Sequence, residues 1–207
     1  MKIYLIIGKN IDLKNYVFED DSLKIGIDKG SFIALENGIK LDYAVGDFDS
    51  SSEEEKSEIL THVPHVIELN PIKDDTDTKH AYSMWRDQEN VAFVILGGIM
   101  GQRIEHFYAN LELVMNDKRV SIEDDNSKIF MIDGEEHLFK DKYKYVSFFP
   151  IGEKGSLSLK GFAYELENEE IHKGQGLAIS NEFKDDEATI KVNEGKFLTF
   201  LSKNDKV

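Results

Sequence analysis

Short apolar segments alternate with polar and helix-like stretches along the first half of the chain. The apolar segments fall at residues 2–7, 24–28, 43–47, 65–69 and 91–96. Helices are plausible between several of them, and this alternation is typical of a mainly parallel sheet covered by helices. The first half is therefore predicted to be an α/β fold with a mainly parallel sheet and flanking helices.

Two helices have recognisable starts in this half. The serines at 51–52 and the glutamates at 54–55 form a capping-box pattern, which predicts a helix through about Leu60. Another helix is expected to start near Thr76 and to run past Trp85, which is then most simply a core anchor.

The most regular helix is expected over residues 103–115, where apolar residues recur at spacings of three and four. These residues form one stripe that faces the core. Arg103, His106 and Asn110 lie on an adjoining face, so their polar groups can point toward the same space. For His106 alone, a surface or hydrogen-bonded role is favoured over a catalytic one.

The pattern changes after about Asp125 to short strands separated by turns, with glycines at the breaks. Such a pattern predicts an antiparallel β-sandwich or barrel-like domain. We find no low-complexity linker between the two halves. The predicted organisation is an α/β domain at residues 1–125, for catalysis and nucleotide binding, followed by a β-sandwich domain at residues 126–207.

Composition narrows the possible partners. The chain has 207 residues, a formal net charge of −15 and no cysteine. An acidic chain is unsuited to neutralising nucleic-acid phosphates or to lying on anionic lipid, although metal ions and a few local cations can still recruit ATP. Without cysteine, disulfides, thiolate metal sites and cysteine nucleophiles are excluded.

The opening sequence MKIYLIIGKN contains only a short apolar run before glycine and charged residues. This run is too short for the core of a signal peptide or for a membrane span. We expect it to be a buried first strand of a cytoplasmic protein, with no membrane partner.

Polar or glycine-rich loops follow four of the predicted strands. In an open parallel sheet, ligands bind outside the carboxyl ends of the strands, so these loops are expected to meet at one site. The loops contain Asp28; Asp47 and Asp49; Lys73 with Asp74, Asp75 and Asp77; and Gly97, Gly98 and Gly101.

Acidic motifs give this site its chemistry. Gly46-Asp47-Phe48-Asp49-Ser50 places two carboxylates two residues apart, and Asp74-Asp75-Thr76-Asp77 adds more. Mg²⁺ prefers one or two carboxylates together with water and substrate phosphates. Turns and helix caps explain each motif alone. Their joint occurrence favours a cation and phosphate site, and hence an enzyme of phosphoryl or pyrophosphoryl transfer.

The glycines at 97, 98 and 101 can let the backbone approach a phosphate closely, and Arg103 adds a charged donor at the following helix start. The loop is neither a GxGxxG motif nor a Walker loop, and a tight turn without a ligand remains the alternative. Phosphoryl transfer needs mainly alignment and charge neutralisation, and no credible Ser-His-Asp signature competes with it.

Seven segments together resemble the thiamine pyrophosphokinase family. They are IDKG, GIKLDYAVGDFDS, KDDTDTKHA and GGIMGQRIEHFYAN in the first half, and YVSFFPIG, LKGFAYEL and GLAISNE in the second. The family's usual forms are close to DGG, GDFDS, KDxTD, a GG-R-DH-N helix and SNE. The order and spacing make the resemblance specific, and it covers most of the chain.

The resemblance implies transfer of the pyrophosphoryl group of ATP to the hydroxyl of thiamine, giving thiamine diphosphate and AMP. It also implies Mg²⁺, an α/β domain followed by a β-sandwich, and a homodimer with sites at the subunit interface. By similarity, the Mg²⁺ ligands are Asp47, Asp49 and Asp77. The catalytic residues implied are Asp49, Asp74, Asp77 and Arg103. The nucleotide-binding residues implied are Asp28, Gly30, Lys73, Gly97, Gly98, Gln102, Arg103 and His106, and the thiamine contacts are Asp47, Ser180 and Asn181.

Four positions depart from the family pattern. Lys29 stands where a second glycine is common, Gln102 where a glycine is usual, and Glu105 where aspartate is usual. Lys79 replaces a glutamate that bacterial members often carry, and it reverses a charge one helical turn from the expected metal site. None of these departures removes a carboxylate from the expected metal site.

Two other functions are compatible with parts of the pattern. A pyrophosphokinase of the same architecture that acts on another hydroxymethyl heterocycle, such as a pterin, would share the ATP half. A non-catalytic sensor of thiamine diphosphate or nucleotide would share the fold, although retention of all the acidic positions argues against it.

Overall fold

The computed structural model describes residues 1–8, 10–72, 74–99 and 103–203. The chain divides into two compact units. Unit 1 comprises Met1–Leu113 with Ile122–Asp125, and unit 2 comprises Val114–Ser121 with Asn126–Val207. None of the helices in these described ranges is long and apolar enough to span a membrane.

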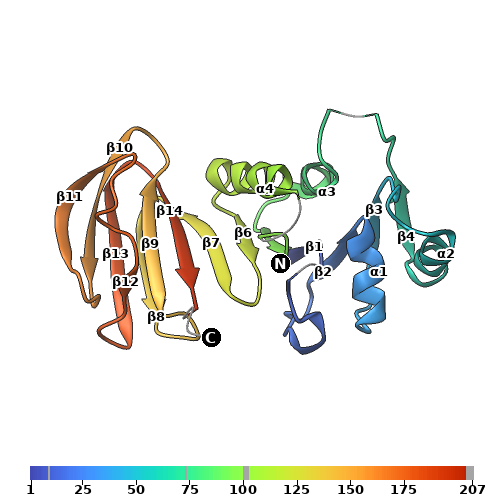
Figure 1. Ribbon diagram of the computed structural model, residues 1–207, viewed down its shortest axis with the longest axis horizontal. Coiled ribbons are helices and arrows are strands. Elements are labelled where there is room, and N and C mark those ends of the chain that lie inside the picture. The colour runs from blue at the N-terminus through green and yellow to red at the C-terminus, as the bar shows by residue number, and fades with distance from the viewer. Residues whose placement is uncertain (9, 73, 100–102, 204–207) are drawn as a thin grey trace. The chain divides into compact units, whose positions relative to one another are not determined.

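Unit 1 is built on a parallel sheet with strand order β5-β1-β2-β3-β4 (Figure 1). Its strands are β1 (Lys2–Ile6), β2 (Leu23–Ile27), β3 (Tyr43–Gly46), β4 (His65–Glu68) and β5 (Ala92–Leu96). The parallel sheet predicted from the alternating pattern is therefore confirmed. Strand β6 (Val120–Glu123) contains residues of both units.

Helices connect the strands of unit 1, and their starts follow from local capping. The helices are α1 (Lys29–Glu36), α2 (Glu53–His62), α3 (Asp77–Trp85) and α4 (Ile104–Asn116), with a short 3₁₀ turn η1 (Leu13–Asn15). The predicted capping box starts α2: Ser52 Oγ accepts from the Glu55 N–H, and the Glu55 side chain accepts from the Ser52 N–H. Thr76 caps α3 in the same manner by accepting from the Lys79 N–H.

The core of unit 1 forms between the sheet and its helices because the central strands are apolar on both faces. Tyr4, Ile6 and Leu96 are at most 2% exposed. Ala34 of α1 and Ile59 of α2 pack into the same cluster. This packing holds the carboxyl ends of the strands, and the loops that follow them, in fixed positions.

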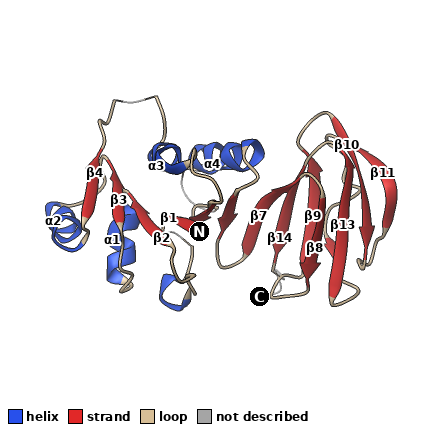
Figure 2. Cartoon of the chain, turned by 180° about the vertical axis from the view of Figure 1, so that it is seen from behind, coloured by secondary structure: helices blue, strands red, loops and turns tan. Residues whose placement is uncertain are grey.

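Apart from the last residues of α4, the described part of unit 2 consists of strands and turns (Figure 2). Its strands are β7 (Ser127–Ile132), β8 (Glu135–Phe139), β9 (Tyr145–Pro150), β10 (Lys154–Lys160), β11 (Leu166–His172), β12 (Asn181–Glu182), β13 (Glu187–Glu194) and β14 (Phe197–Ser202). They pair antiparallel in the orders β12-β9-β14-β7 and β11-β10-β13-β8. The antiparallel β-sandwich predicted from the sequence is confirmed.

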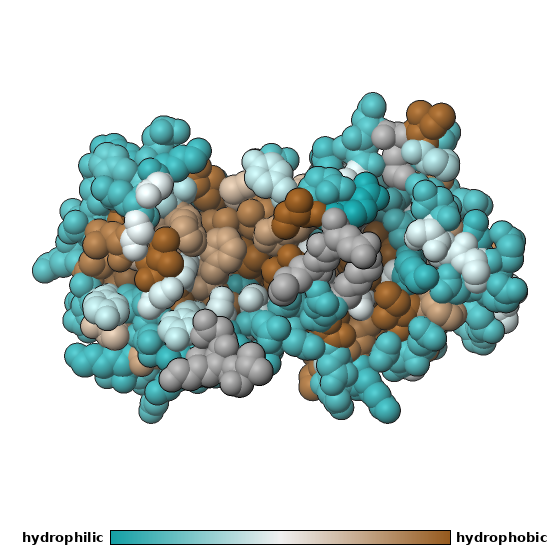
Figure 3. All heavy atoms as spheres, viewed as in Figure 1, coloured by the Kyte–Doolittle hydropathy of each residue, from teal (hydrophilic) through white to brown (hydrophobic). Residues whose placement is uncertain are grey.

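Alternating side chains fill the interior of this sandwich. Phe148, Phe162 and Phe197 are at most 1% exposed and belong to one cluster with Leu157 and Ile190. On the face seen in Figure 3, apolar residues also gather at the surface of unit 2. Unit 2 therefore has its own core.

Candidate functional site

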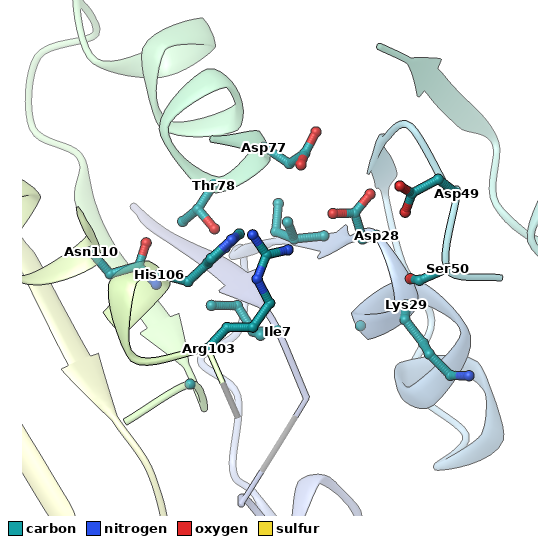
Figure 4. Close-up of a pocket in the computed structure, with 13 residues that line it drawn as sticks. Ile7, Asp28, Lys29, Asp49, Ser50, Asp77, Thr78, Arg103, His106 and Asn110 are labelled. Carbon is teal, nitrogen blue, oxygen red and sulfur yellow. The ribbon is translucent and has the colours of Figure 1, made fainter. Parts of the chain in front are cut away.

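A cavity of about 260 Å³ lies in unit 1, beyond the carboxyl ends of the parallel strands (Figure 4). It is lined by Ile7, Ile27, Asp28, Lys29, Gly30, Asp49, Ser50, Asp77, Thr78, Gly98, Arg103, His106 and Asn110. These residues come from the ends of β1 and β2, from the loops after β3 and β5, and from α1, α3 and α4. The structure thus brings together four of the chain segments that the sequence placed at one sheet edge.

Asp28 lies at the centre of this arrangement because it directly follows β2. Its backbone has a φ of 46° and its N–H donates to the Val45 carbonyl at 3.0 Å. Gly46 lies against the Asp28 carboxylate so closely that a Cβ there would overlap it. The absence of a side chain at Gly46 therefore allows this carboxylate to stand at the end of β3.

Gly30 has a packing role that the sequence did not reveal. A Cβ at this position would overlap the carbonyl of Ile6 and the backbone of Ile7. Gly30 therefore allows the first turn of α1 to lie directly against the end of β1. Its proposed part in nucleotide binding is compatible with this role, since it also lines the cavity.

Asp28 and Asp77 form a close pair of carboxyl groups. Burial, followed by the charge of Asp77 and a hydrogen bond between the two carboxyls, raises the pKa of Asp28 to about 7. The Phe48 N–H partly offsets this rise by donating to Asp28, and the charge of Asp47 adds to it. The cavity therefore holds excess negative charge that a cation would stabilise.

The loop after β3 presents Asp49 to the cavity. Phe48 has a φ of 53° and is only 4% exposed, so its ring is anchored while the backbone turns. The Asp49 N–H donates to Asp47 Oδ1 at 3.2 Å. Asp47 lies close enough to Asp28 to affect its pKa, but it is not among the residues that line the cavity.

Positive charge faces these carboxylates from the start of α4. Figure 4 shows the guanidinium of Arg103 and the ring of His106 directed toward the space beside Asp28 and Asp77. Arg103 Nε also donates to Glu105 Oε1 at 2.8 Å, and this hydrogen bond lowers the pKa of the Glu105 carboxyl. Because Arg103 is largely exposed, it keeps further N–H groups for a ligand.

Gly97 and Gly98 adopt backbone conformations that favour glycine, with φ values of 86° and 81°. Gly98 lines the cavity, whereas the Gly97 N–H donates to the Glu123 carbonyl at 2.7 Å. Lys73 and Gln102, both expected to bind nucleotide, lie outside the described residues.

The fit of a metal ion can be judged from the donor groups. In the described part of the chain, no three acidic or histidine side chains are arranged to hold a metal ion by themselves. Mg²⁺, however, commonly takes one or two carboxylates and completes its shell with water and substrate phosphates. Asp28, Asp49 and Asp77 offer such carboxylates around a solvent-accessible cavity, so the donor chemistry fits Mg²⁺. Asp74 is exposed and is not among the residues lining this cavity.

Ser180 and Asn181 lie in unit 2. Asn181 is 3% exposed, and its side chain is bound on two sides by Tyr164: Oδ1 accepts from the Tyr164 N–H at 3.0 Å, and Nδ2 donates to the Tyr164 carbonyl at 2.7 Å. Oδ1 also accepts from the Glu182 N–H. Ser180 is exposed, and its N–H donates to Ser147 Oγ at 2.9 Å. Ser180 thus retains a hydroxyl for a ligand, whereas the Asn181 amide mainly holds the backbone.

Sequence reasoning did not assign site roles to several residues that line the cavity. Thr78 follows Asp77 in the first turn of α3, and Ser50 follows Asp49, so proximity to the acidic motifs was an available signal. Asn110 shares the α4 face of Arg103 and His106 and is 4% exposed. Lys29 was noted only as a departure from the family pattern. The two isoleucines, Ile7 and Ile27, gave no signal beyond their place at strand ends.

The parallel α/β fold and its cavity of carboxylates, arginine and glycine define the class as an enzyme of phosphoryl-group transfer. Comparison with known proteins identifies the family. Residues 15–123 match the description "Thiamin pyrophosphokinase, catalytic domain", and residues 132–197 match "Thiamin pyrophosphokinase, vitamin B1 binding domain". The chain belongs to the thiamin pyrophosphokinase family.

Individual relatives agree with this assignment. A protein of Bacillus subtilis (strain 168) named thiamine pyrophosphokinase is 35% identical in an alignment 203 residues long that covers 92% of each chain. A crystal structure of thiamine pyrophosphokinase from Bacillus subtilis has a TM-score of 0.90 at 30% identity and covers 99% of this chain and 100% of that one. One from Geobacillus thermodenitrificans has a TM-score of 0.89 at 28% identity, covering 100% and 99%.

Proposed function

We propose that the protein transfers the pyrophosphoryl group of ATP to the hydroxyl of thiamine, giving thiamine diphosphate and AMP. The observation that carries this proposal is the cavity in which Asp28, Asp49 and Asp77 face Arg103, within the segment that matches the family's catalytic domain. Opposed charges around one cavity suit a reaction that moves a highly charged group with little covalent help from the protein.

We propose different roles in the reaction for different residues of the cavity. Arg103 takes up charge on the transferring group through its N–H donors, and Lys73 is proposed to do the same. His106, Gly98 and Gly30 border the space for the nucleotide. Asp74 remains a proposed catalytic residue on the basis of the family resemblance alone.

A bound Mg²⁺ would neutralise phosphate charge and align the groups for in-line attack. We propose that Asp49 and Asp77 hold it from the cavity lining, and that Asp47, which lies near Asp28 but does not line the cavity, is the third ligand. Asp28, paired with Asp77, would then orient that carboxylate. A carboxylate near the thiamine hydroxyl could accept its proton, although a loose transition state asks little of a base.

Thiamine recognition is proposed for the second unit, because residues 132–197 match the vitamin B1 binding domain. Ser180 is the stronger direct contact of the two predicted there, because it is exposed. Asn181 instead fixes the backbone at Tyr164, whose side chain is 69% exposed. Both residues therefore support recognition, Ser180 by contact and Asn181 by position.

A homodimer and a cytoplasmic location remain proposals. An aromatic pair in unit 2, the exposed Phe149 and the half-buried Phe200 with ring centroids 5.4 Å apart, supports assembly because exposed apolar surface often marks an interface. Sedimentation of the purified protein would show whether it pairs.

The proposed reaction is tested by incubating the protein with Mg²⁺, ATP and thiamine and separating the products by chromatography. Thiamine-dependent AMP and thiamine diphosphate, absent with EDTA, are the expected result. Intact ATP with thiamine still bound would overturn the proposal and point to a sensor. Intact ATP without thiamine binding would overturn it and call for the same assay with hydroxymethyl pterins.

A further inference from the structure

Two consecutive residues, Asp28 and Lys29, hold the two ends of the loop that carries Asp47 and Asp49. At the first end, the Phe48 N–H donates to Asp28 Oδ1 at 3.4 Å. Lys29 acts on the second end through Glu55, since Lys29 Nζ lies 3.2 Å from Glu55 Oε1.

Glu55 connects Lys29 to the loop itself. Its other oxygen, Oε2, accepts from the Ser52 N–H at 2.8 Å, and the Glu55 N–H donates to Ser52 Oγ at 3.2 Å. The Glu55 side chain is 17% exposed and the Lys29 side chain 45% exposed, so the ion pair is partly accessible to solvent. Within the loop, the Ser51 N–H donates to the Phe48 carbonyl at 3.1 Å. A closed ring of contacts therefore runs from Asp28 through Phe48, along the loop, and back through Glu55 to Lys29.

The direction of the Lys29 side chain indicates whether Lys29 holds the loop through Glu55 or contacts a bound phosphate directly. Lys29 lines the cavity, but Figure 4 shows its ammonium group turned away from Asp28 and Asp49. Its charge is directed to Glu55 and not toward the place where phosphates would bind. The geometry therefore favours a structural tether over a direct phosphate contact.

The acidic loop needs such a tether because its charges repel those nearby. Asp47 and Asp49 lie on the loop, and Asp28 and Asp77 lie beside it. Before a cation binds, this repulsion favours movement of the loop away from the cavity. An ion pair at the end of the loop opposes that movement without adding a further charge inside the cavity.

We propose that Lys29 is a positioning residue: acting through Glu55, it holds loop 47–52 in the conformation that presents Asp49 to the cavity. The expected effect of Lys29 on metal and ATP binding rests on the proposed function. The effect of Lys29 on the conformation of loop 47–52 is independent of that function and can be measured in the metal-free protein.

Hydrogen–deuterium exchange of the metal-free full chain is the first test. In Lys29→Met, amides of residues 47–52 should exchange about two- to fivefold faster, as the loss of a partly exposed ion pair implies. Glu55→Gln should speed exchange of the same amides by a similar factor. The variant with both Lys29→Met and Glu55→Gln should exchange no faster than either single variant. Lys29→Arg should restore protection. Lys56→Met, which removes a neighbouring charge from α2, is the matched control and should leave the loop unchanged.

Metal binding provides the second readout. The Mn²⁺ concentration that half-saturates the protein, measured by electron paramagnetic resonance, should rise about two- to fivefold in Lys29→Met and stay unchanged in Lys56→Met.

Hydrogen–deuterium exchange in Lys29→Met at the wild-type rate would overturn the proposal. So would a higher KM for ATP on adding Lys29→Met to Glu55→Gln, because Lys29 would then contact phosphate directly. Absence of thiamine-dependent AMP in the wild type would instead overturn the proposed function and leave the exchange result standing.

Discussion

The cavity of unit 1 and the Asn181 contacts of unit 2 use polar side chains in opposite ways. In unit 1, Asp28 and Asp77 are placed side by side although they repel, and the pKa of Asp28 rises to about 7 as a result. In unit 2, the buried amide of Asn181 makes three hydrogen bonds to backbone groups. The cavity of unit 1 therefore holds carboxylates that repel one another and can bind a cation. The Asn181 amide of unit 2 has its hydrogen bonds satisfied within the protein.

This difference separates groups that act on a ligand from groups that build the surface around it. A half-buried repulsive pair lowers stability, and a bound cation can relieve the repulsion. A saturated amide stabilises the fold and has little capacity left for a ligand. The comparison therefore predicts that substitution of Asp49 or Arg103 in unit 1 changes the rate at nearly constant stability, whereas substitution of Asn181 changes stability together with thiamine binding.

The largest effect is expected for Asp49→Asn. This variant keeps the shape of the side chain but removes a charge that would hold Mg²⁺, so kcat should fall by about 1000-fold or more. The unfolding midpoint should stay close to that of the wild type because Asp49 is exposed. Asp87→Asn, at a carboxylate that is 91% exposed, is the control for the charge change. A near-normal rate in Asp49→Asn would remove Asp49 from the metal site.

Arg103→Lys should have the next largest effect. Lysine keeps the positive charge but loses the planar fork of donors, so kcat should fall by about 10- to 100-fold, with a smaller change in the KM for thiamine. Steady-state kinetics with ATP and thiamine varied in turn would show the split. Glu105→Ala removes the acceptor of the Arg103 Nε hydrogen bond and serves as the comparison. Equal losses in both variants would mean that the Arg103–Glu105 contact, and not the guanidinium itself, supports the rate.

Local sequence patterns predicted the features of this fold that depend on short-range rules. The capping box at Ser52 and Glu55 starts α2 as predicted. The apolar spacing over residues 103–115 correctly predicted the helix α4, Ile104–Asn116. The expectation that the whole stripe faces the core was wrong, because helical spacing shows which residues share a face and not whether another element covers it: Val114 is buried, but Ile104 is 67% exposed and Tyr108 is 58% exposed. Alternating short strands after residue 125 predicted an antiparallel sandwich because each strand has one buried face.

Features that depend on approach between distant segments could not be predicted. The sequence placed the loops of Asp28 and Asp77 at one edge of the sheet, but nothing near either residue encodes how closely the two carboxyl groups approach. The motif predicts a thiamine contact at Asn181. It carries no information on whether the Asn181 amide is already hydrogen-bonded to Tyr164, as it is in the structure. Lys29 stood out only as a departure from a family pattern, whereas its contact with Glu55 depends on how α1 and α2 pack.

Asn181→Ala tests the unit 2 side of the comparison. The substitution removes the hydrogen bonds that the buried Asn181 amide makes to the backbone of Tyr164, so the free energy of unfolding should fall by about 1–3 kcal/mol. The KM for thiamine should rise while the KM for ATP stays unchanged. Denaturant unfolding and steady-state kinetics measure the two effects.

Ser180→Ala and Asn193→Ala are the matched variants for Asn181→Ala. Ser180→Ala should raise the KM for thiamine without changing stability, because the Ser180 backbone contact to Ser147 does not involve its hydroxyl. Asn193 is exposed and bonds to Ser158, so its loss should affect neither quantity much. A higher thiamine KM in Asn181→Ala at wild-type stability would assign Asn181 a direct contact.

The smallest effect is expected for the pH dependence of stability in metal-free protein. Because folding raises the pKa of Asp28 from 3.8 to about 7, the folded state retains a proton that the unfolded state loses between these values. The contribution of Asp28 to the free energy of unfolding therefore falls as pH rises through this window, and the full penalty is present above it.

The variant Asp28→Asn removes this penalty, and its amide oxygen can still accept from the Phe48 N–H. With a discount for partial solvent screening, the variant should be more stable than the wild type by about 1–2 kcal/mol at about pH 8 and by much less at about pH 4. Thermal melts in EDTA across this range measure the difference, with Asp87→Asn as the control. A gain in stability that is the same at both pH values would mean that relief of charge repulsion at Asp28 is not its source.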